Sequence, residues 1–560
     1  MTEYRLDNKF NDAFKQASLG VSIGENNQLA EFAKILRSGA QMVELDLASL
    51  YGFTGQGTPA ARITKKEREA IGNLARTTDS DLSVHAPWSI NFSGINPKTG
   101  ERNAEYMDLM KKEIAAAINF TDDVSKPMGR RNMPIIFHAA SDNFGSPDPN
   151  MRFSVYDKEQ DKAFTVGPYK IPNVTEREFL DRYTEIKKAY DKLEDEKERK
   201  KFIIQGEGGI TLSPKATFAF LKDQEAMGYS QELASLDISQ HNIELQKKQI
   251  ADSLVDYSIR GTQKELNLIK MKELLDKEEQ GIQNRRFLKE KQLANIDKRF
   301  TRFEEEAPVL AAEGIKDAAI MSAKTSTKPM ILVENTMTPD MSLSDPTDVR
   351  ETIDKARELF VEAAMNDKTL RLSRSGAEDL SRKLIGVNLD VGHLNIFKSY
   401  VNPDTGKPYS DKDIVKMAEK LGDYVKRYHL NDNMGDIDAH LPLGEGTAPI
   451  KEIYETLKNA GVDAPAIMEV FGGVGGITAG MGPSFQYMSA PLFDKTPYAS
   501  LTAYAGNPYS SIVGDYSSYL NLGLRNDLFQ YGGFSGIAPT FGAGYMDNKG
   551  GGDFSGAPMV

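Results

Sequence analysis

The chain alternates short apolar runs with longer amphipathic stretches, and this alternation constrains its fold more than any other feature. The apolar runs contain few polar residues, as expected of parallel strands that are covered on both faces. Eight such runs predict strands: 19–24, 42–48, 82–88, 133–141, 329–337, 385–393, 425–433 and 464–472. Six amphipathic stretches predict helices: 27–39, 65–77, 104–118, 349–365, 411–422 and 450–461.

Eight strand–helix units in one chain predict a (β/α)8 TIM barrel. A doubly wound open sheet is the alternative, but the glycine-rich phosphate fingerprint typical of that fold is missing from the sequence, which favours the barrel. The alternation stops after the fourth strand and resumes at the fifth. We therefore expect two halves of the barrel, residues 1–144 and 329–474, and no helix is evident after the eighth strand.

Residues 145–328 are highly charged and predict a large helical insertion after strand 4. Thr175 and Glu178 have the spacing of a capping box. The apolar residues that follow are four and three positions apart, as in a coiled coil: Phe179, Tyr183, Ile186, Tyr190 and Leu193. We interpret the segment as a mostly helical, partly coiled-coil-like arm, and its part from Pro214 to about Glu306 shows no obvious strand. A solvated antiparallel helix pair is favoured, and a binding site for a protein partner is the alternative.

Residues 475–560 form a low-complexity tail that is rich in Gly, Tyr and Ser and poor in charge. This composition predicts disorder, because it offers too little apolar surface to pack a core. The spaced aromatic residues leave a second interpretation open, namely weak contacts of the tail with itself, with a partner or with nucleic acid.

The chain contains no Cys and only six His among 560 residues, so disulfides, thiolate metal sites and thiol nucleophiles are excluded. The net charge of -12 argues against a general coat for nucleic acid. The polar start MTEYRLDNKF is not a secretory signal, and no run approaches the roughly 18 apolar residues of a spanning helix. We therefore expect a soluble, cytoplasmic protein without a membrane partner.

Imidazole and carboxylate side chains gather at the predicted strand ends, where the active sites of TIM barrels lie. Five of the six histidines and four carboxylates do so: His85, His138, Glu334, Asp390, His393, His429, Asp438, His440 and Glu469. These are ligand types that suit Zn2+, Mn2+ and Fe. Nine ligands exceed the needs of one ion, so we expect two or three, an arrangement that suits phosphoester displacement. His241 lies in the insertion and is expected on its surface.

Seven segments resemble the endonuclease IV family of apurinic/apyrimidinic endonucleases, within the xylose isomerase-like superfamily: VHAPWSINFSG, IIFHAAS, ILVENT, LDVGHLN, YHLNDN, DIDAHLPLGEG and IMEV. The resemblance implies three zinc ions and a DNA partner that carries an abasic site. The implied ligands of the three ions are His85, His138 and Glu334; then Glu334, Asp390, His429 and Glu469; then His393, Asp438 and His440. The implied reaction cleaves the backbone 5′ to the abasic site and leaves a 3′-hydroxyl.

A sugar isomerase or epimerase of the same superfamily is the alternative function. Such enzymes resemble the chain at Glu334, Asp390, His429 and Glu469, which would bind one Mn2+ or Mg2+. Glu334 and Glu469 are the predicted catalytic residues, as ligands in the nuclease and as proton-transfer groups in the isomerase. A barrel that has lost its chemistry and acts as a scaffold is a third hypothesis.

Trp88, the only Trp, has two interpretations as well. It would stack on a base or line a substrate pocket, or it is a core or rim residue.

Overall fold

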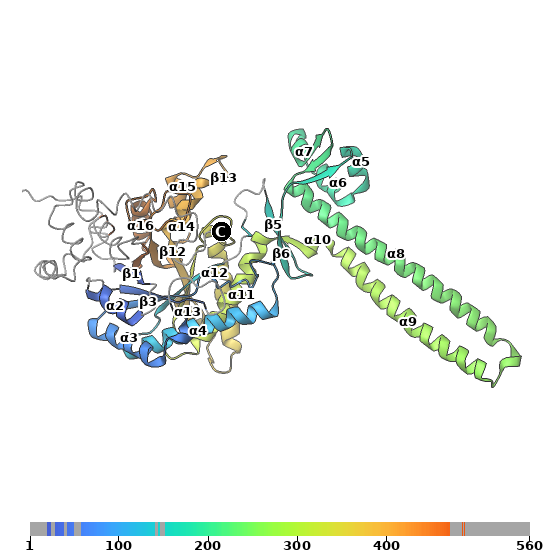
Figure 1. Ribbon diagram of the computed structural model, residues 1–560, viewed down its shortest axis with the longest axis horizontal. Helices are drawn as coiled ribbons and strands as arrows, with labels where there is room; N and C mark the ends of the chain where they lie inside the picture. The colour runs from blue at the N-terminus through green and yellow to red at the C-terminus, as the bar shows by residue number, and fades with distance from the viewer. Residues whose placement is uncertain are drawn as a thin grey trace, which may run out of the picture. The chain divides into compact units, whose positions relative to one another are not determined.

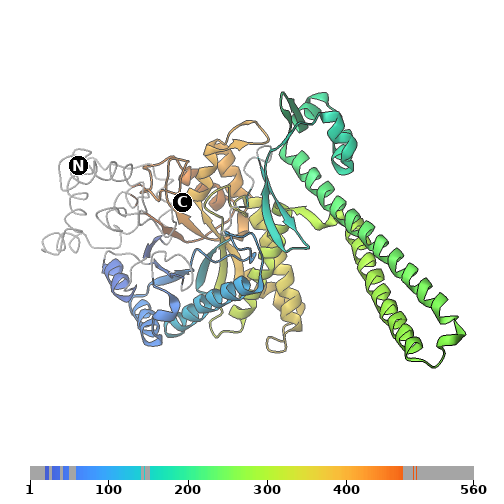
Figure 2. The ribbon, with the colours of Figure 1, turned by 45° about the vertical axis from the view of Figure 1, so that its right-hand side comes forward.

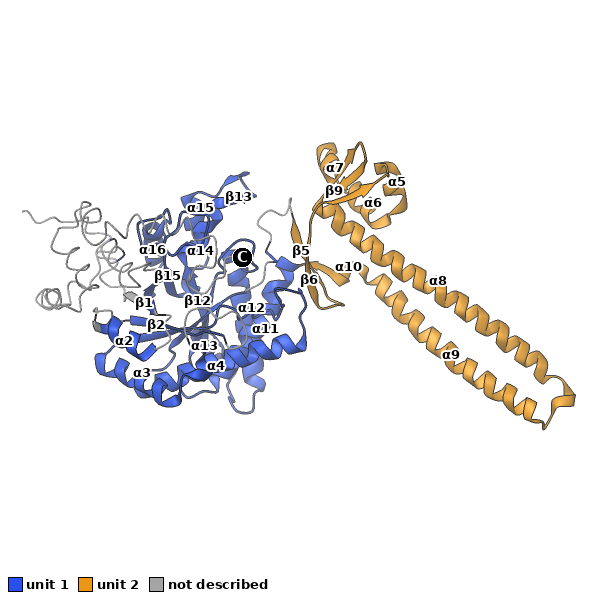
Figure 3. Cartoon of the chain, in the orientation of Figure 1, with its two compact units in different colours: residues 1–148, 303–560 blue, residues 149–302 orange. Residues whose placement is uncertain are grey.

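The computed structural model describes residues 19–23, 28–37, 42–49, 58–140, 144–145, 152–470, 484 and 487. The chain divides into two compact units, residues 1–148 with 303–560 and residues 149–302 (Figure 3). Apart from Ser484 and Tyr487, the predicted tail lies outside the described residues. Among the described helices, none combines the length and the apolar character needed to cross a membrane.

Eight parallel strands of the first unit close into a barrel, so the predicted TIM barrel is confirmed (Figure 1). Each barrel strand pairs with the barrel strands that come before and after it in the chain, so that β4 pairs with β11 although the second unit separates them. β1 pairs with β16 and closes the ring. The strands are β1 (Leu19–Ile23), β2 (Met42–Asp46), β3 (Asp81–His85), β4 (Pro134–His138), β11 (Met330–Glu334), β12 (Ile385–Asp390), β15 (Val425–Leu430) and β16 (Ala466–Met468). All eight lie within or overlap the predicted apolar runs.

Helices on the outside of the barrel connect its strands. They are α2 (Gln28–Arg37), α3 (Lys65–Thr78), α4 (Ala104–Met128), α11 (Phe303–Ala323), α12 (Pro346–Asn366), α13 (Arg374–Leu384), α15 (Asp411–Glu419) and α16 (Ile450–Asn459). Local sequence sets their ends. Thr64 and Glu67 form a capping box that starts α3, and Gly129, with φ of 69°, ends α4. Position 129 needs a positive φ, which glycine adopts without a steric penalty.

Short elements complete the loops of the barrel unit. They are η1 (Ala60–Arg62), α14 (Val391–Asn395), η3 (Ile396–Ser399), the hairpin of β13 (Val401–Asn402) and β14 (Lys407–Pro408), and η4 (Gly422–Tyr424). The one-turn helix α14 matters for the site, because it begins directly where β12 ends.

The barrel resumes earlier than the sequence predicts. The predicted insertion runs to residue 328, whereas the second unit ends at residue 302 and α11 follows as a barrel helix. Helix α11 buries Leu310, Ala311 and Ile315 against the barrel unit. The sequence of α11 has a charged first turn and many alanines and therefore shows no narrow apolar stripe, so the prediction assigned it to the insertion.

The second unit contains two small sheets besides its helices, and one of their strands, Phe300–Arg302, lies in the part from Pro214 to about Glu306 where the sequence shows no obvious strand. One sheet consists of β5 (Phe153–Asp157), β6 (Lys162–Val166) and β10 (Phe300–Arg302), and another of β7 (Tyr169–Pro172), β8 (Ile203–Gly206) and β9 (Gly209–Leu212). The helices are α5 (Glu176–Arg182), α6 (Thr184–Asp191), α7 (Glu196–Phe202), α8 (Pro214–Leu254), η2 (Tyr257–Ile259), α9 (Gln263–Ala294) and α10 (Ile296–Arg299).

The predicted apolar stripe does not form one coiled-coil helix. The capping box at Thr175 starts α5, but the chain is extended at Tyr183, where α5 gives way to α6. The stripe instead packs into a small core with Phe202 and Phe220. The coiled-coil-like pair is α8 with α9, which run side by side in Figures 1 and 2. Its core repeats every seven residues and contains Ile243, Ile250, Leu275 and Ile282.

Candidate metal centre

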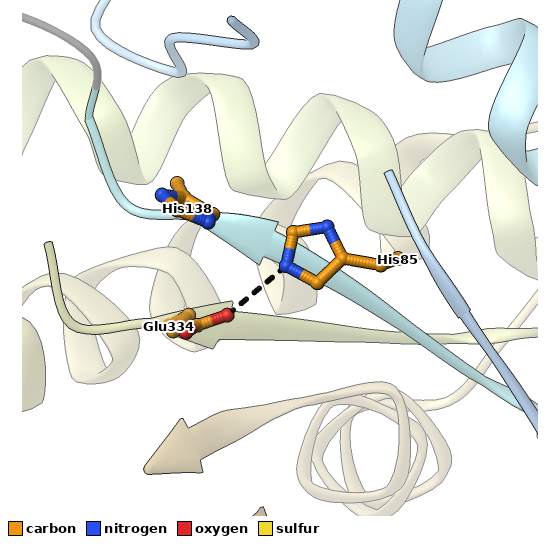
Figure 4. Close-up of side chains that lie close together, drawn as sticks. All are labelled: His85, His138 and Glu334. Atoms are coloured by element: carbon orange, nitrogen blue, oxygen red, sulfur yellow. Dashed lines mark ion pairs between the residues drawn. The ribbon is translucent and has the colours of Figure 1, made fainter. Parts of the chain in front are cut away.

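Three predicted ligands from neighbouring strands meet at the carboxyl end of the barrel. His85, His138 and Glu334 are the last residues of β3, β4 and β11, and they lie together in Figure 4. The Nε2 atom of His85 is 3.3 Å from Oε2 of Glu334. Because parallel strands end at the same rim, three strand-end residues become one group of possible ligands.

A second group shares Glu334 and contains Asp390, His429 and Glu469. The Nδ1 atom of His429 is 3.3 Å from Oε1 of Glu334 and 3.2 Å from Oε1 of Glu469. Glu334 therefore directs one carboxylate oxygen to each group, since its Oε2 faces His85. This arrangement suits a carboxylate that bridges two ions.

The third group contains His393, Asp438 and His440. Both imidazoles face one carboxylate oxygen, because Nε2 of His393 is 3.4 Å and Nε2 of His440 is 3.0 Å from Oδ2 of Asp438. His393 is placed by α14, whose N-cap Asp390 accepts its backbone N–H at 2.7 Å. All nine predicted ligands thus lie in the centre, and these three groups have the memberships that the resemblance implies. A further overlapping group contains His85, His429 and Glu469.

The three groups fit divalent cations. Two ligands of one tetrahedral ion at about 2.1 Å lie about 3.4 Å apart, close to the 3.0–3.4 Å between imidazoles and carboxylates here. His85, His393 and His440 each direct Nδ1 at a backbone carbonyl, which can only accept a hydrogen bond. In the neutral ring, Nε2 then carries a lone pair that faces a carboxylate. Such a contact requires a proton or a cation between the two atoms.

The raised pKa values of two imidazoles also show that a positive charge is favoured between imidazole and carboxylate. Burial lowers the pKa of His85, but the hydrogen bond and charge of Glu334 outweigh it and raise the pKa to about 10. Burial also lowers the pKa of His440, but the charge and hydrogen bond of Asp438 outweigh it and raise the pKa to about 9. His138 differs, since burial lowers its pKa to about 4 despite the charge of Glu334. As a candidate ligand, its neutral imidazole would bind an ion at pH 7 without competition from protons.

The carboxylates respond to this mixture of burial and charge. Burial raises the pKa of Asp390 to about 7, although the charge of His393 opposes it. The pKa of Glu469 falls to about 2, because the charge and hydrogen bond of His429 outweigh burial. The pKa of Glu334 also falls well below its usual range, since His429 and His138 overcome burial there. Divalent ions would replace the protons that now balance these groups.

Two carboxylates of β2, Glu44 and Asp46, lie at the centre but were not predicted from the sequence. Glu44 is fully buried, and its Oε1 is 2.9 Å from Nε2 of His429. Asp46 ends β2 and accepts the hydroxyl hydrogen bond of Ser22 at 2.8 Å. Burial raises the pKa of Asp46 to about 7, against the charge of His85. The signal was the alternation in VELD, which places both acids on one face of a strand.

Polar residues behind the ligands hold the loops of the centre. Asn431 donates a hydrogen bond of 2.7 Å to Oδ2 of Asp390. Asp432 accepts backbone N–H groups of Asn433, Gly444 and Ala448, each at 2.9 Å. These contacts fix the loop that carries Asp438 and His440. Asn431 and Asp432 are part of the sequence segment HLNDN, but their hydrogen-bond partners become apparent only in the folded loop.

Trp88 and His241, the other residues considered in the sequence analysis, lie at and away from the centre respectively, and two basic residues of the barrel unit are engaged or buried. Trp88 follows β3 and is half-buried, and its indole N–H has no partner among the described residues. His241 lies exposed on α8, in the second unit. Lys398 pairs with Asp411 at 2.6 Å. Arg427 is buried inside the barrel, where burial lowers its pKa against the charge of Glu44.

The fold and the site together define a TIM barrel with a candidate metal centre of histidines and carboxylates at its strand ends. A family model described as "Xylose isomerase-like TIM barrel" matches residues 301–488. This match includes α11, the last four strands and seven of the nine predicted ligands: Glu334, Asp390, His393, His429, Asp438, His440 and Glu469.

Two further similarities are short or weak. An uncharacterized protein of Methanocaldococcus jannaschii, MJ1311, is 30% identical over 92 residues. The aligned part covers 16% of this chain and 28% of that protein. The solved structure of a D-tagatose 3-epimerase-like protein is 12% identical, with a TM-score of 0.38 over 85% of this chain and 99% of that one. A TM-score of this size carries no argument about function.

Proposed function

We propose that the protein is a zinc-dependent phosphodiesterase of the endonuclease IV type, which cleaves DNA 5′ to abasic sites. One observation carries the proposal. The third group, His393, Asp438 and His440, is complete beside the four-residue group that contains Glu334 and Glu469. An isomerase that uses one ion does not need a second set of ligands a few ångströms away, whereas phosphoester cleavage uses clustered ions.

Bound ions would supply positive charge for a phosphodiester, Lewis acidity, and a water of lowered pKa. The chain's own residues would hold and orient these ions. Glu334 joins the first and second groups through its two oxygens, and Asp438 joins two imidazoles through one. His138 is neutral at pH 7 and needs no deprotonation before it binds.

Two residues on the carboxyl side of the barrel bear on the substrate. Lys398, in η3 after α14, is engaged by Asp411 and by the backbone carbonyl of Thr447. Trp88 lies just beyond His85, where a flat ring can stack on a base or a sugar.

The second candidate function is a sugar isomerase or epimerase that uses one Mn2+ or Mg2+. It is favoured by the four-residue group, because Glu334, Asp390, His429 and Glu469 are sufficient for one ion on their own. In this reaction Glu334 or Glu469 would move a proton beside the substrate carbonyl. The third group, His393, Asp438 and His440, would then bind no ion.

One substitution separates the two functions. His393→Ala removes a ligand of the third group and none of the four-residue group. The wild type is expected to bind about three zinc ions and to nick a duplex with one abasic analogue, leaving a 3′-hydroxyl. His393→Ala should bind one zinc fewer and lose nicking, whereas His241→Ala, on the exposed face of α8, should keep both.

Three outcomes would overturn the proposal. An isomerase would leave the abasic duplex intact, would epimerise a ketose, and would keep that activity in His393→Ala. A wild type that binds one ion per chain would contradict the three-ion centre. A wild type that binds none would favour the scaffold hypothesis.

A further inference from the structure

Ser484 and Tyr487 lie in the predicted tail, and the structure describes both as helical residues of the barrel unit. Ser484 is fully buried and Tyr487 is half-buried. Side chains three positions apart on a helix lie on one face. The match to the family model extends to residue 488 and includes both residues. The two side chains are therefore placed to contact one surface together.

That surface is the loop that carries two candidate ligands of the third group. The hydroxyl of Ser484 accepts the backbone N–H of Leu443 at 3.0 Å. The Tyr487 ring lies against Gly444, where a β-carbon would overlap it. Gly444 has φ of 88°, a value that favours glycine, so the backbone and the ring both exclude a larger residue there.

Tyr487 also contacts the helix that follows the loop. The Nζ atom of Lys451, in the first turn of α16, is 4.5 Å from the centre of the Tyr487 ring. An ammonium group over an aromatic ring is attracted to it. Burial, then the charges of Asp432 and Glu452, raises the pKa of the Tyr487 hydroxyl to about 12, so the side chain is neutral at pH 7. The ring thus joins the loop to α16 without adding a charge.

The loop depends on contacts of this kind. Asp432 accepts the N–H of Gly444 at 2.9 Å. The N–H of Leu443, one residue earlier, has Ser484 as its acceptor, and a buried backbone N–H is costly without one. His440, three residues before Leu443, has φ of 48°, which a residue other than glycine adopts only when its surroundings hold it.

We propose that Ser484 and Tyr487 are positioning residues of the candidate metal centre. They hold residues 441–444 in place and so keep Asp438 and His440 directed at the ion of the third group. The ligands of the first group end strands and are fixed by the sheet, whereas these two lie in a loop after β15. The inference rests on the three-ion centre of the proposed function, but not on the nuclease reaction.

The test compares Tyr487→Ala and Tyr487→Phe with a matched control in the full chain. Tyr424 is also half-buried, and its ring centre is 4.7 Å from the guanidinium carbon of Arg357. It directly precedes β15, at the end of the barrel opposite the centre. Zn2+ affinity is measured by competition with a coloured chelator. Tyr487→Ala should weaken one zinc site about tenfold. Tyr487→Phe should keep most of that affinity, because it retains the ring, and Tyr424→Ala should match the wild type.

A double substitution assigns the effect to the third group. In His393→Ala the third ion is already lost, so the addition of Tyr487→Ala should not weaken the remaining zinc further. A residue that merely stabilises the whole barrel would instead weaken zinc binding in both backgrounds.

Hydrogen exchange tests the contact of Ser484 without reference to metal or activity. The amide of Leu443 should be protected in the wild type, because its N–H is bound to the Ser484 hydroxyl. In Ser484→Ala the peptide that covers residues 441–444 should exchange about fivefold faster, with and without zinc. Tyr424→Ala should leave this exchange unchanged.

The outcomes distinguish this inference from the proposed function. If Ser484→Ala and Tyr487→Ala bind zinc like Tyr424→Ala, the two residues do not position the ligands, even where exchange is faster. If Tyr487→Ala fails to fold, Ser484→Ala decides on the same readouts. If the wild type binds three zinc ions but does not nick abasic DNA, the nuclease proposal fails while the positioning role stands. If His393→Ala binds as much zinc as the wild type, the third group holds no ion and both fail.

Discussion

Replacing Asp432 by Ala should release the loop that carries the third group. Asp432 follows β15 and is 1% exposed. Its Oδ1 accepts the N–H groups of Asn433 and Ala448, and its Oδ2 accepts that of Gly444, each at 2.9 Å. The carboxylate therefore ties the two ends of the loop together. Asp438 and His440, two candidate ligands of the third group, lie between those ends.

The cost follows from the donors that lose their acceptor. Gly444 is exposed, so water can replace the carboxylate there, whereas Ala448 and Asn433 are buried. Each buried N–H without a partner costs about 1–3 kcal/mol. We expect Asp432→Ala to lower the free energy of unfolding by about 3–4 kcal/mol. Asp432→Asn keeps the shape and one acceptor oxygen, so about half of that loss is expected.

The assay uses the single tryptophan. Trp88 lies in the barrel unit, so its fluorescence during urea unfolding of the full chain reports on the barrel alone. Zinc content measured in parallel should fall by one ion. Asp436→Ala is the matched control, because Asp436 is exposed in the same loop and, among the described residues, accepts only the N–H of Ile437. If both variants unfold at the same urea concentration and hold equal zinc, the assigned role of Asp432 is wrong.

Three further predictions address the ions and the acidic groups. His138→Ala removes a ligand of the first group, so nicking should be lost while the Trp88 unfolding transition persists; unchanged nicking would contradict the ligand assignment. Chelation of the zinc should lower the melting temperature and zinc should restore it, since saturation to 100 times Kd stabilises by about 2.7 kcal/mol per site. Burial, then the charges of Asp345 and Glu304, raises the pKa of Asp348 to about 7, above its unfolded value of about 4. The folded state therefore loses stability as pH rises from about 4 to 7, at most about 4 kcal/mol, and Asp348→Asn should raise the melting temperature at pH 8 but not at pH 4. Equal shifts at both pH values would contradict this explanation.

The barrel strands could be predicted because each is a short apolar run between helices with clear ends. The strand IGVNLD, for example, forms β12 as Ile385–Asp390. Helix α11 could not be recognised as the fourth barrel helix, because its alanines bury several faces and leave no narrow stripe. The strands of the second unit were missed for another reason. β5 pairs with β10, which lies more than 140 residues later, and nothing local announces such a pairing.

The ligands of the candidate centre could be predicted because topology alone brings strand ends together. His85 and His138 need only be the last residues of β3 and β4 to meet. Glu44 lies two residues before the end of β2, and it meets His429 only through the closure of the barrel between β1 and β16. The ring orientation of His429 is likewise a property of packing, since both its nitrogens are possible ligands in the sequence.

The balance of buried charge supports a centre with several ions. Four predicted carboxylate ligands, together with Glu44 and Asp46, place six acids in and around the site, and the guanidinium of Arg427 offsets one. With neutral imidazoles, three divalent ions bring this balance to within one charge, whereas a single ion leaves three negative charges. A one-ion site would therefore keep protons on other groups, such as the imidazoles of His393 and His440 or the carboxyls of Asp390 and Asp46, whose pKa values burial raises to about 7. Zinc binding should consequently release more protons from a three-ion nuclease than from a one-ion isomerase, and titration in weakly buffered solution measures that number.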